Sequence, residues 1–171
     1  MTSLSLAPWS GQGLDLLRRQ NTPELTEHLG GPETDEQLRR RHERYLGLAD
    51  GQMFLVALDG RVIGSIGYWP REWDGEPVFE TGYGILPEYQ GRGFAVEALR
   101  LCAERAGRDG SRPWLHAFPS VHHGASNAVC RKAGFAWVGE CTFEYPPGNF
   151  IRSNNWRFPL TPLPRAHFPH D

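Results

Sequence analysis

The stretch Gly82-Tyr83-Gly84-Ile85-Leu86-Pro87-Glu88-Tyr89-Gln90-Gly91-Arg92-Gly93-Phe94-Ala95 decides the fold, because an apolar strand here runs into a turn of small residues that opens a helix. Backbone N–H groups at a helix N-terminus have no partner within the helix and lie at the positive end of its dipole, so they bind anions. Gly91 and Gly93 have no Cβ atom to keep an anion at a distance, and Arg92 adds a positive charge. The turn from Gln90 to Ala95, which we call the cradle, therefore indicates a pyrophosphate site.

Two other phosphate-binding loops do not fit this turn. A dinucleotide-binding loop carries a third glycine three residues after Gly93, where this chain has Val96, and no acidic residue ends a following strand at the expected distance. A Walker loop needs Gly-Lys followed by Ser or Thr, which is absent here. A tight strand-to-helix turn without any ligand uses the same glycines. The patterns around the cradle must decide between a binding site and a structural turn.

Length and composition narrow the class of protein. The chain has 171 residues, enough for one domain that buries roughly 70% of its unfolded surface. A formal charge of -2 gives no electrostatic basis for general nucleic-acid binding. The three cysteines, Cys102, Cys130 and Cys141, are an odd number in a chain without a signal peptide, which favours reduced thiols. No apolar run approaches the ~20 residues that span a bilayer. We expect a cytoplasmic monomer or homodimer with no membrane or nucleic-acid partner.

Turn and capping residues predict the elements before the cradle. Thr22 followed by Pro23 is typical of a helix start, and Thr34 with Gln37 forms a capping-box pattern. Asp59-Gly60 is a strong hairpin turn. We expect a strand over 14–18, helices starting after Thr22 and Thr34, strands over 53–58 and 61–68, a loop over 69–77 and a strand over 78–85.

The second half continues this alternation of strands and helices. We expect a helix over 91–106, a strand over 113–118, a helix from about 125 to Gly134, and a hairpin of strands over 135–145 and 150–160. Such an order predicts an α/β protein with a central mixed sheet. Residues 1–160 then form a single domain, followed by a Pro- and His-rich tail over 161–171.

Two patterns resemble the GNAT superfamily of N-acetyltransferases. Gln-x-x-Gly-x-Ala over 90–95 is similar to the loop that binds the pyrophosphate of acyl-coenzyme A in that family. The segment 125–135 resembles the family's helix-to-strand pattern N-x-x-S…K-x-G-F; Ser126 takes the Ser position and His123 falls where the pattern has Asn. The order of elements over about 14–160 also resembles this fold, in the branch that includes ribosomal-protein N-terminal acetyltransferases. The resemblance implies a mostly antiparallel central sheet flanked by helices.

The resemblance also implies acetyl-CoA as cosubstrate and no metal. The strand-edge backbone groups of Gly84, Ile85 and Leu86 are expected to pair with the pantetheine amides, and the amides from Gln90 to Ala95 to hold the pyrophosphate. A backbone N–H near Gly84 or Ile85 is expected to face the thioester oxygen. The family Asn that bonds the pantetheine arm is replaced here by His123 or by Asn127. The residues expected to contact the cofactor are Gly84, Ile85, Leu86, Gln90, Gly91, Arg92, Gly93, Phe94, Ala95, His123, Ser126 and Asn127.

Glu80 is the expected general base, because many members of the family place a carboxylate ten positions before the Gln of the loop. An amine with a pKa near 10.4 is protonated at pH 7, so direct attack on the thioester needs a proton acceptor. Strict alternation puts Glu80 on one face with Gly82 and Gly84. A glutamate paired with Arg or Lys on a solvated face is the structural alternative.

The residue that protonates the departing thiolate is less well marked. Many members of the family have a Tyr where this chain has Cys130. A thiol can donate a proton, but a buried Cys is as readily a small apolar side chain. Nucleophilic catalysis by Cys130 would need His122 or His123 as its base. Water can also protonate the thiolate.

Two functions from different classes fit these residues. The first is an N-acetyltransferase that moves an acetyl group from acetyl-CoA directly to a primary amine of a small molecule or a protein N-terminus. The alternative is a catalytically silent acyl-CoA-binding sensor or scaffold, which needs neither Glu80 nor an N–H directed at the thioester. Aromatic residues that could line an acceptor pocket or the core are Trp69, Trp73, Phe118, Tyr145 and Trp156.

Overall fold

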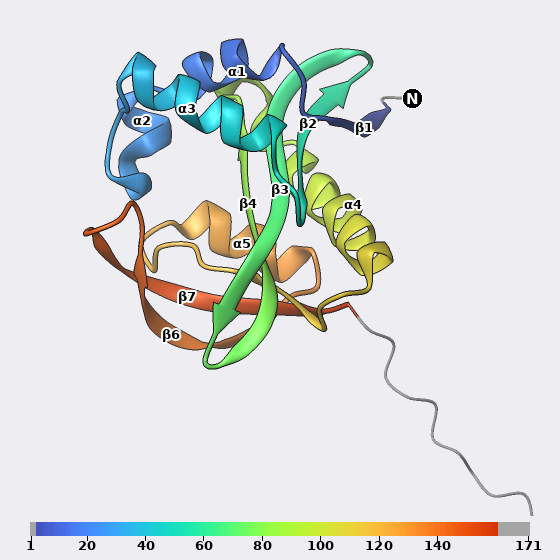
Figure 1. Cartoon of the computed structure of the whole chain (residues 1–171), viewed down its shortest axis with the longest axis vertical. Helices are drawn as coiled ribbons and strands as arrows, with labels where there is room; N and C mark the ends of the chain where they lie inside the picture. Colours follow the sequence, from blue (N-terminus) through green and yellow to red (C-terminus); the bar gives the residue numbers. More distant parts are fainter. Residues whose placement is uncertain (1–2, 161–171) are drawn as a thin grey trace, which may run out of the picture.

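The computed structural model describes residues 3–160, which form a seven-stranded sheet with helices on both faces (Figure 1). The strand order is β1-β2-β3-β4-β5-β7-β6, and every neighbouring pair is antiparallel except β4 with β5. The strands are β1 (Leu4–Pro8), β2 (Gln52–Leu58), β3 (Arg61–Trp73), β4 (Glu76–Ile85), β5 (Trp114–Ala117), β6 (Ala136–Glu144) and β7 (Phe150–Pro159). The helices are α1 (Gly13–Gln20), α2 (Pro23–Thr26), α3 (Asp35–Leu46), α4 (Phe94–Asp109) and α5 (Gly124–Lys132), with 3-10 turns η1 (Glu27–Leu29) and η2 (Pro87–Tyr89). The expected class, a mixed and mostly antiparallel sheet flanked by helices, is confirmed.

The two faces of the sheet carry separate cores. Along β2, Phe54 and Val56 pack in the core that includes α4 and α5, whereas Met53 and Leu55 pack with α1 and α3. Side chains of a strand point alternately to opposite faces, so one strand supplies both cores. The core under α4 and α5 and the core under α1 and α3 are therefore separated by the backbone of the central strands.

The capping and turn predictions are confirmed. Thr22 accepts a hydrogen bond from the Leu25 N–H at the start of α2. At α3 both halves of the capping box form between Thr34 and Gln37. Asp59 turns the β2–β3 hairpin with a positive φ, as does the glycine that follows it. These contacts lie within a few residues, which is why sequence alone locates them.

Residues 14–18 are wrongly predicted as a strand. They lie inside α1, whose Leu16 and Leu17 are buried against α3 and β2. The first strand is instead β1, which alternates Leu4 and Leu6 with smaller residues and pairs with β2. The five residues 14–18, three of them leucines, fit the periodicity of a strand as well as that of a helix. Their packing against α3 stabilises the helix.

The predicted loop over 69–77 is also wrong, because both strands of the hairpin continue to a two-residue turn. Asp74 and the glycine after it have positive φ, and the β3–β4 register runs unbroken from Gly64 to Trp73. Pro70 is tolerated there because β2 pairs with β3 only as far as Tyr68, which leaves the outer edge of β3 open.

The parallel pair β4 and β5 is the one irregular feature of the sheet that matters for function. β4 pairs with β3 along its whole length, but with β5 only at Phe79 and Glu80. From Thr81 to Ile85 the edge of β4 that faces β5 is therefore open. The predicted tail over 161–171 lies outside the described residues, and no helix within 3–160 is long and apolar enough to cross a membrane.

Candidate active site

The cradle connects the open edge of β4 to the start of α4. Gly91 and Gly93 have φ values of 73° and 84°, in the left-handed region that favours glycine, and a Cβ atom at either would meet no atom within 4 Å. The Gln90 side chain donates from Nε2 to the Ile85 carbonyl at 2.9 Å and so fastens the turn to the end of β4. The space over both glycines is open.

The cradle presents a run of unpaired backbone donors. From Gly91 to Val96, no backbone N–H donates to an acceptor within residues 3–160, and the first to do so is that of Glu97, to the Gly93 carbonyl at 3.1 Å. The exposed Arg92 guanidinium lies 4.9 Å from the Phe94 ring, beside these donors. Unpaired N–H groups, a helix dipole and a cation are the groups that favour binding of an anion with several oxygens.

Register decides which backbone groups of β4 are free. The Leu86 N–H donates to the Ile63 carbonyl at 2.8 Å, and the Gly84 carbonyl accepts from Gln20 Nε2 at 3.1 Å. Because the backbone N–H of Leu86 is directed at β3, the alternation of hydrogen-bonding direction along a strand turns the backbone groups of Ile85 and Tyr83 toward the open edge of β4. Of the three residues expected to pair with pantetheine, Ile85 offers a free N–H there.

Two hydroxyls and a thiol form a cluster that joins β4 to α5 beside the open edge of β4, a place that we call the opening. The Tyr83 hydroxyl lies 2.9 Å from Ser126 Oγ and 3.4 Å from Cys130 Sγ, and it also donates to the Ser126 carbonyl. Cys130 is fully buried, and burial raises the pKa of its thiol to about 11. Such a thiol stays protonated at neutral pH, which disfavours nucleophilic catalysis.

His123 and Asn127 occupy different environments on α5. The Asn127 amide donates to two backbone carbonyls and accepts from Asn154 and Trp156, so all its hydrogen bonds are made within the protein. The His123 ring instead stacks on His28 at 4.4 Å between ring centroids, and burial lowers its pKa. Of this segment, His123 and Ser126 retain groups to offer a ligand.

Glu80 lies on the opposite face of β4 and is buried, not solvated. It is only 7% exposed; its carboxylate accepts a hydrogen bond from Trp69 Nε1 and lies 3.6 Å from Arg71 Nη1. The unbroken register puts it on one face with Gly82 and Gly84, as alternation predicts. Burial raises the pKa of Glu80, and the Arg71 charge and the Trp69 hydrogen bond oppose this shift. The raised pKa suits a proton acceptor that works near neutral pH.

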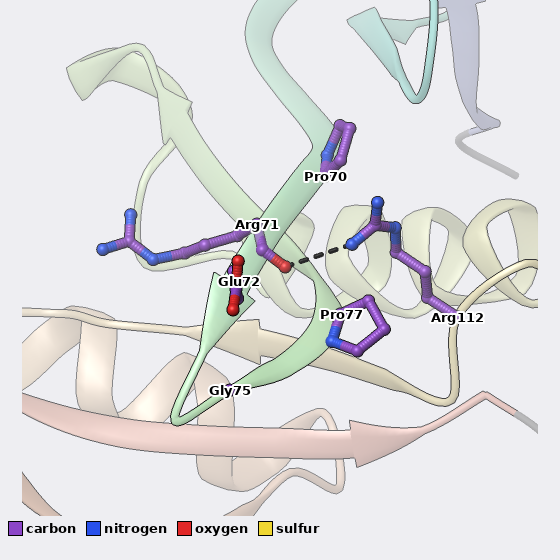
Figure 2. Close-up of a pocket in the computed structure, with 6 residues that line it drawn as sticks. All are labelled: Pro70, Arg71, Glu72, Gly75, Pro77 and Arg112. Carbon is purple, nitrogen blue, oxygen red and sulfur yellow. Dashed lines mark hydrogen bonds between the residues drawn. The ribbon is translucent and has the colours of Figure 1, made fainter.

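Arg71 is the main residue of this region that sequence reasoning missed, because it lies in the segment predicted as a loop. Its guanidinium carbon lies 4.4 Å from the ring centroid of Phe143 and 5.5 and 5.6 Å from those of Trp73 and Phe118. Its backbone carbonyl accepts a hydrogen bond from Arg112 at 3.2 Å, and Figure 2 shows the Arg71 side chain leaving the opposite side of the strand.

His116 completes the surroundings of Glu80. It is the register partner of Glu80 on β5, and its Nδ1 lies 2.7 Å from Asn155 Oδ1. Burial lowers the pKa of His116, so the imidazole is neutral at pH 7. Within residues 3–160 no group of three His, Cys, Asp or Glu side chains is placed to hold a metal ion. The groups around Glu80 are thus a guanidinium, a neutral imidazole and aromatic rings.

A model of the acetyltransferase (GNAT) domain matches residues 3–136. The chain belongs to the GNAT acetyltransferases. No curated protein matches it. The expected family is thus confirmed.

Solved structures share the fold of this GNAT acetyltransferase at low sequence identity. The acetyltransferase from Salmonella typhimurium that modifies the N-terminal serine of 50S ribosomal subunit protein L7/L12 is 20% identical, with a TM-score of 0.77 over 92% of this chain and 95% of that one. Aminoglycoside acetyltransferase AAC(6')-Ib in complex with coenzyme A is 18% identical, with a TM-score of 0.74 over 92% and 95%. Spermidine N-acetyltransferase from Vibrio cholerae in complex with coenzyme A and spermine is 15% identical, with a TM-score of 0.75 over 92% and 95%.

Proposed function

We propose that the protein transfers an acetyl group from acetyl-CoA directly to a primary amine. The observation that carries this proposal is the run of unpaired N–H groups from Gly91 to Val96, placed where the open edge of β4 ends. A pyrophosphate bound there directs the rest of the cofactor along that edge. The acetyl group then lies beside Glu80, a carboxylate that is partly shielded from solvent. A transferase needs such a proton acceptor, whereas a protein that only senses acyl-CoA does not.

The cofactor is held mainly by backbone groups. The cradle amides and Arg92 neutralise the pyrophosphate, while the Tyr83 and Ile85 edge pairs with the pantetheine amides as an added strand would. His123 and Ser126 lie across the opening on α5 and contact the same arm. Because backbone groups need no rearrangement, this site is ready before the cofactor arrives.

Glu80 accepts a proton from the acceptor ammonium. An amine with a pKa near 10.4 is almost wholly charged at pH 7, and only the neutral form attacks a thioester. Since Glu80 is 7% exposed, the amine reaches it by a single hydrogen bond or through one water molecule. A backbone N–H of the open edge of β4 polarises the thioester carbonyl, where negative charge develops in the tetrahedral transition state.

The Tyr83 and Ser126 hydroxyls supply the proton that the departing thiolate takes. They lie 2.9 Å apart at the opening between β4 and α5, so one can donate to the sulfur while the other replaces its proton. Cys130 stabilises this pair and is not itself the donor, because burial raises its pKa and it lies behind Tyr83. Attack by the amine and departure of the thiolate thus use opposite faces of β4.

The acceptor is a primary amine of a small molecule or of a protein N-terminus. The proteins of similar fold support this class of acceptor, since they include an aminoglycoside acetyltransferase, a spermidine N-acetyltransferase and an acetyltransferase of the N-terminal serine of a ribosomal protein. All are less than 25% identical to this chain, so they support a reaction type and no particular substrate.

A panel of primary amines with acetyl-CoA tests this function. Release of free thiol, followed by the mass of the product, should show one added acetyl group on an amine nitrogen. A reaction without acceptor measures hydrolysis alone. If calorimetry shows tight coenzyme A binding but no amine in the panel is acetylated, the protein is a sensor; if coenzyme A does not bind, the cradle assignment is wrong.

A further inference from the structure

The Arg71 side chain is a half-buried cation that makes no hydrogen bond within the described chain. No nitrogen of its guanidinium donates to an acceptor in the described chain, its Nε atom is buried without a partner, and its only ion pair is the 3.6 Å contact with Glu80. Guanidinium groups carry five donors, and buried polar groups in proteins are normally paired. The Nη donors of Arg71 are therefore free to bind an acceptor that comes from outside the protein.

Aromatic rings hold this guanidinium in place. Phe143, Phe118 and Trp73 surround its central carbon, and they also contact one another: Phe118 lies 4.8 Å from Phe143 and 4.5 Å from Trp73, centroid to centroid. Arg112 fixes the Arg71 backbone from the other side of the strand (Figure 2). The side chain is nevertheless 29% exposed. A planar fork that is fixed, partly open and unpaired matches the geometry of a carboxylate.

We propose that Arg71 binds a carboxylate on the carbon that also carries the reacting amine, so that the acceptor is an α-amino acid. This inference rests on the proposed acetyl transfer. Glu80 and Arg71 place an anion and a cation 3.6 Å apart, and the ammonium and carboxylate of an α-amino acid likewise flank a single carbon atom. Each charge of the zwitterion then meets its opposite. A polycation without a carboxylate would instead leave Arg71 unpaired and be repelled by it.

The reaction balances with these groups. The α-ammonium loses one proton to Glu80, and its nitrogen attacks the thioester carbon to form the new C–N bond. The C–S bond breaks, the nitrogen loses its second proton, and the thiolate takes one proton to give coenzyme A; the other is released to solvent. Arg71 does not exchange a proton, because a guanidinium stays charged at all relevant pH values.

Matched acceptors and variants test this inference. Glycine, the eighteen L-amino acids with a primary α-amine and the α-amides of all of them are compared as acceptors for the wild-type protein, for Arg71→Gln, and for Arg71→Lys, which keeps the charge without the fork. We expect the best amino acid to exceed its amide by about 10- to 100-fold in kcat/KM, since hydrogen bonds to charged groups are worth that much. The ratio should fall to near one in Arg71→Gln, mostly through KM, and be intermediate in Arg71→Lys.

Two further readouts separate binding from folding and from catalysis. Arg152→Gln removes a surface arginine that pairs with Glu140 and is the control for loss of one positive charge. The acid limb of the rate profile should move to higher pH in Arg71→Gln, because Arg71 lowers the pKa of Glu80; the neighbouring His116 is common to both proteins. Calorimetry, in which the amino acid is titrated into the coenzyme A complex, measures binding of the carboxylate by Arg71 without acetyl transfer. We call this contact the anchor.

The outcomes divide the two proposals. Amides that react as well as amino acids in the wild-type protein, or a ratio unchanged in folded Arg71→Gln and Arg71→Lys, would overturn the anchor and leave the transferase intact. Amino-acid binding that is lost in Arg71→Gln without any acetyl transfer would support the anchor and count against the transferase. No binding of any amino acid to the wild-type protein would overturn the anchor.

Discussion

The two faces of β4 present different kinds of chemical groups to a ligand. On the side of α4 and α5, the groups offered to a ligand are almost all backbone N–H groups, within a run of six residues around two glycines. On the side of Glu80, they are side chains from four strands: Glu80 on β4, Arg71 on β3, His116 on β5 and Phe143 on β6. The first arrangement suits a cofactor common to a family, and the second can change with the acceptor.

The largest effect is expected from a substitution on the acceptor side, at Glu80. Glu80→Gln keeps the size of the side chain but cannot accept a proton, so kcat/KM for acetyl transfer should fall by ~10²–10⁴. Coenzyme A affinity should hardly change, because the cradle does not use Glu80. The deficit should shrink as pH rises and neutral amine becomes abundant. Steady-state kinetics from pH 6 to 10 measure this, with Glu76→Gln on the same strand as the control; a variant as active as wild type at pH 7 would make Glu80 a structural residue.

A smaller effect is expected where the two sides meet. Tyr83→Phe removes the hydroxyl that lies 2.9 Å from Ser126 Oγ. Loss of one hydrogen bond should lower the transfer rate by about five- to tenfold, with little change in coenzyme A affinity. Tyr68→Phe, at a buried tyrosine of β3, controls for packing. Equal rates in the two variants would remove the Tyr83 hydroxyl from the proton path.

The smallest effect is expected at Cys130, where the chain departs from the Tyr of its family. Direct transfer needs no thiol nucleophile, so Cys130→Ala should keep activity within about twofold and lose roughly 1 kcal/mol of stability from a filled core position. Thermal unfolding and intact mass after incubation with acetyl-CoA measure both. A protein-bound acetyl group that disappears in Cys130→Ala, with ping-pong kinetics, would replace direct transfer by an acyl-enzyme.

The same contrast explains what the sequence could predict. The cradle, the helix caps and the Asp59 hairpin depend on residues close together in the chain, so their spacing alone locates them. The position of Glu80 followed from strand alternation, because no bulge interrupts β3 and β4. The burial of Glu80 could not be predicted, since its partners Trp69 and Arg71 lie in the segment 69–77. The prolines of that segment favour a loop in the sequence, although it forms part of the β3–β4 hairpin. Nor could spacing show that the Asn127 side-chain oxygen accepts hydrogen bonds from Asn154 and Trp156 of β7.

Coenzyme A titration of two matched glycine variants tests most directly the claim that backbone groups bind the cofactor. Gly93 and Gly75 have φ values of 84° and 77°, and a Cβ atom at either meets no neighbour within 4 Å, so Gly93→Val and Gly75→Val impose the same backbone strain. Only Gly93 lies at the cradle. Calorimetry should show affinity reduced by at least about tenfold in Gly93→Val, through lost amide contacts, and unchanged in Gly75→Val. Equal affinities in the two folded variants would contradict the account.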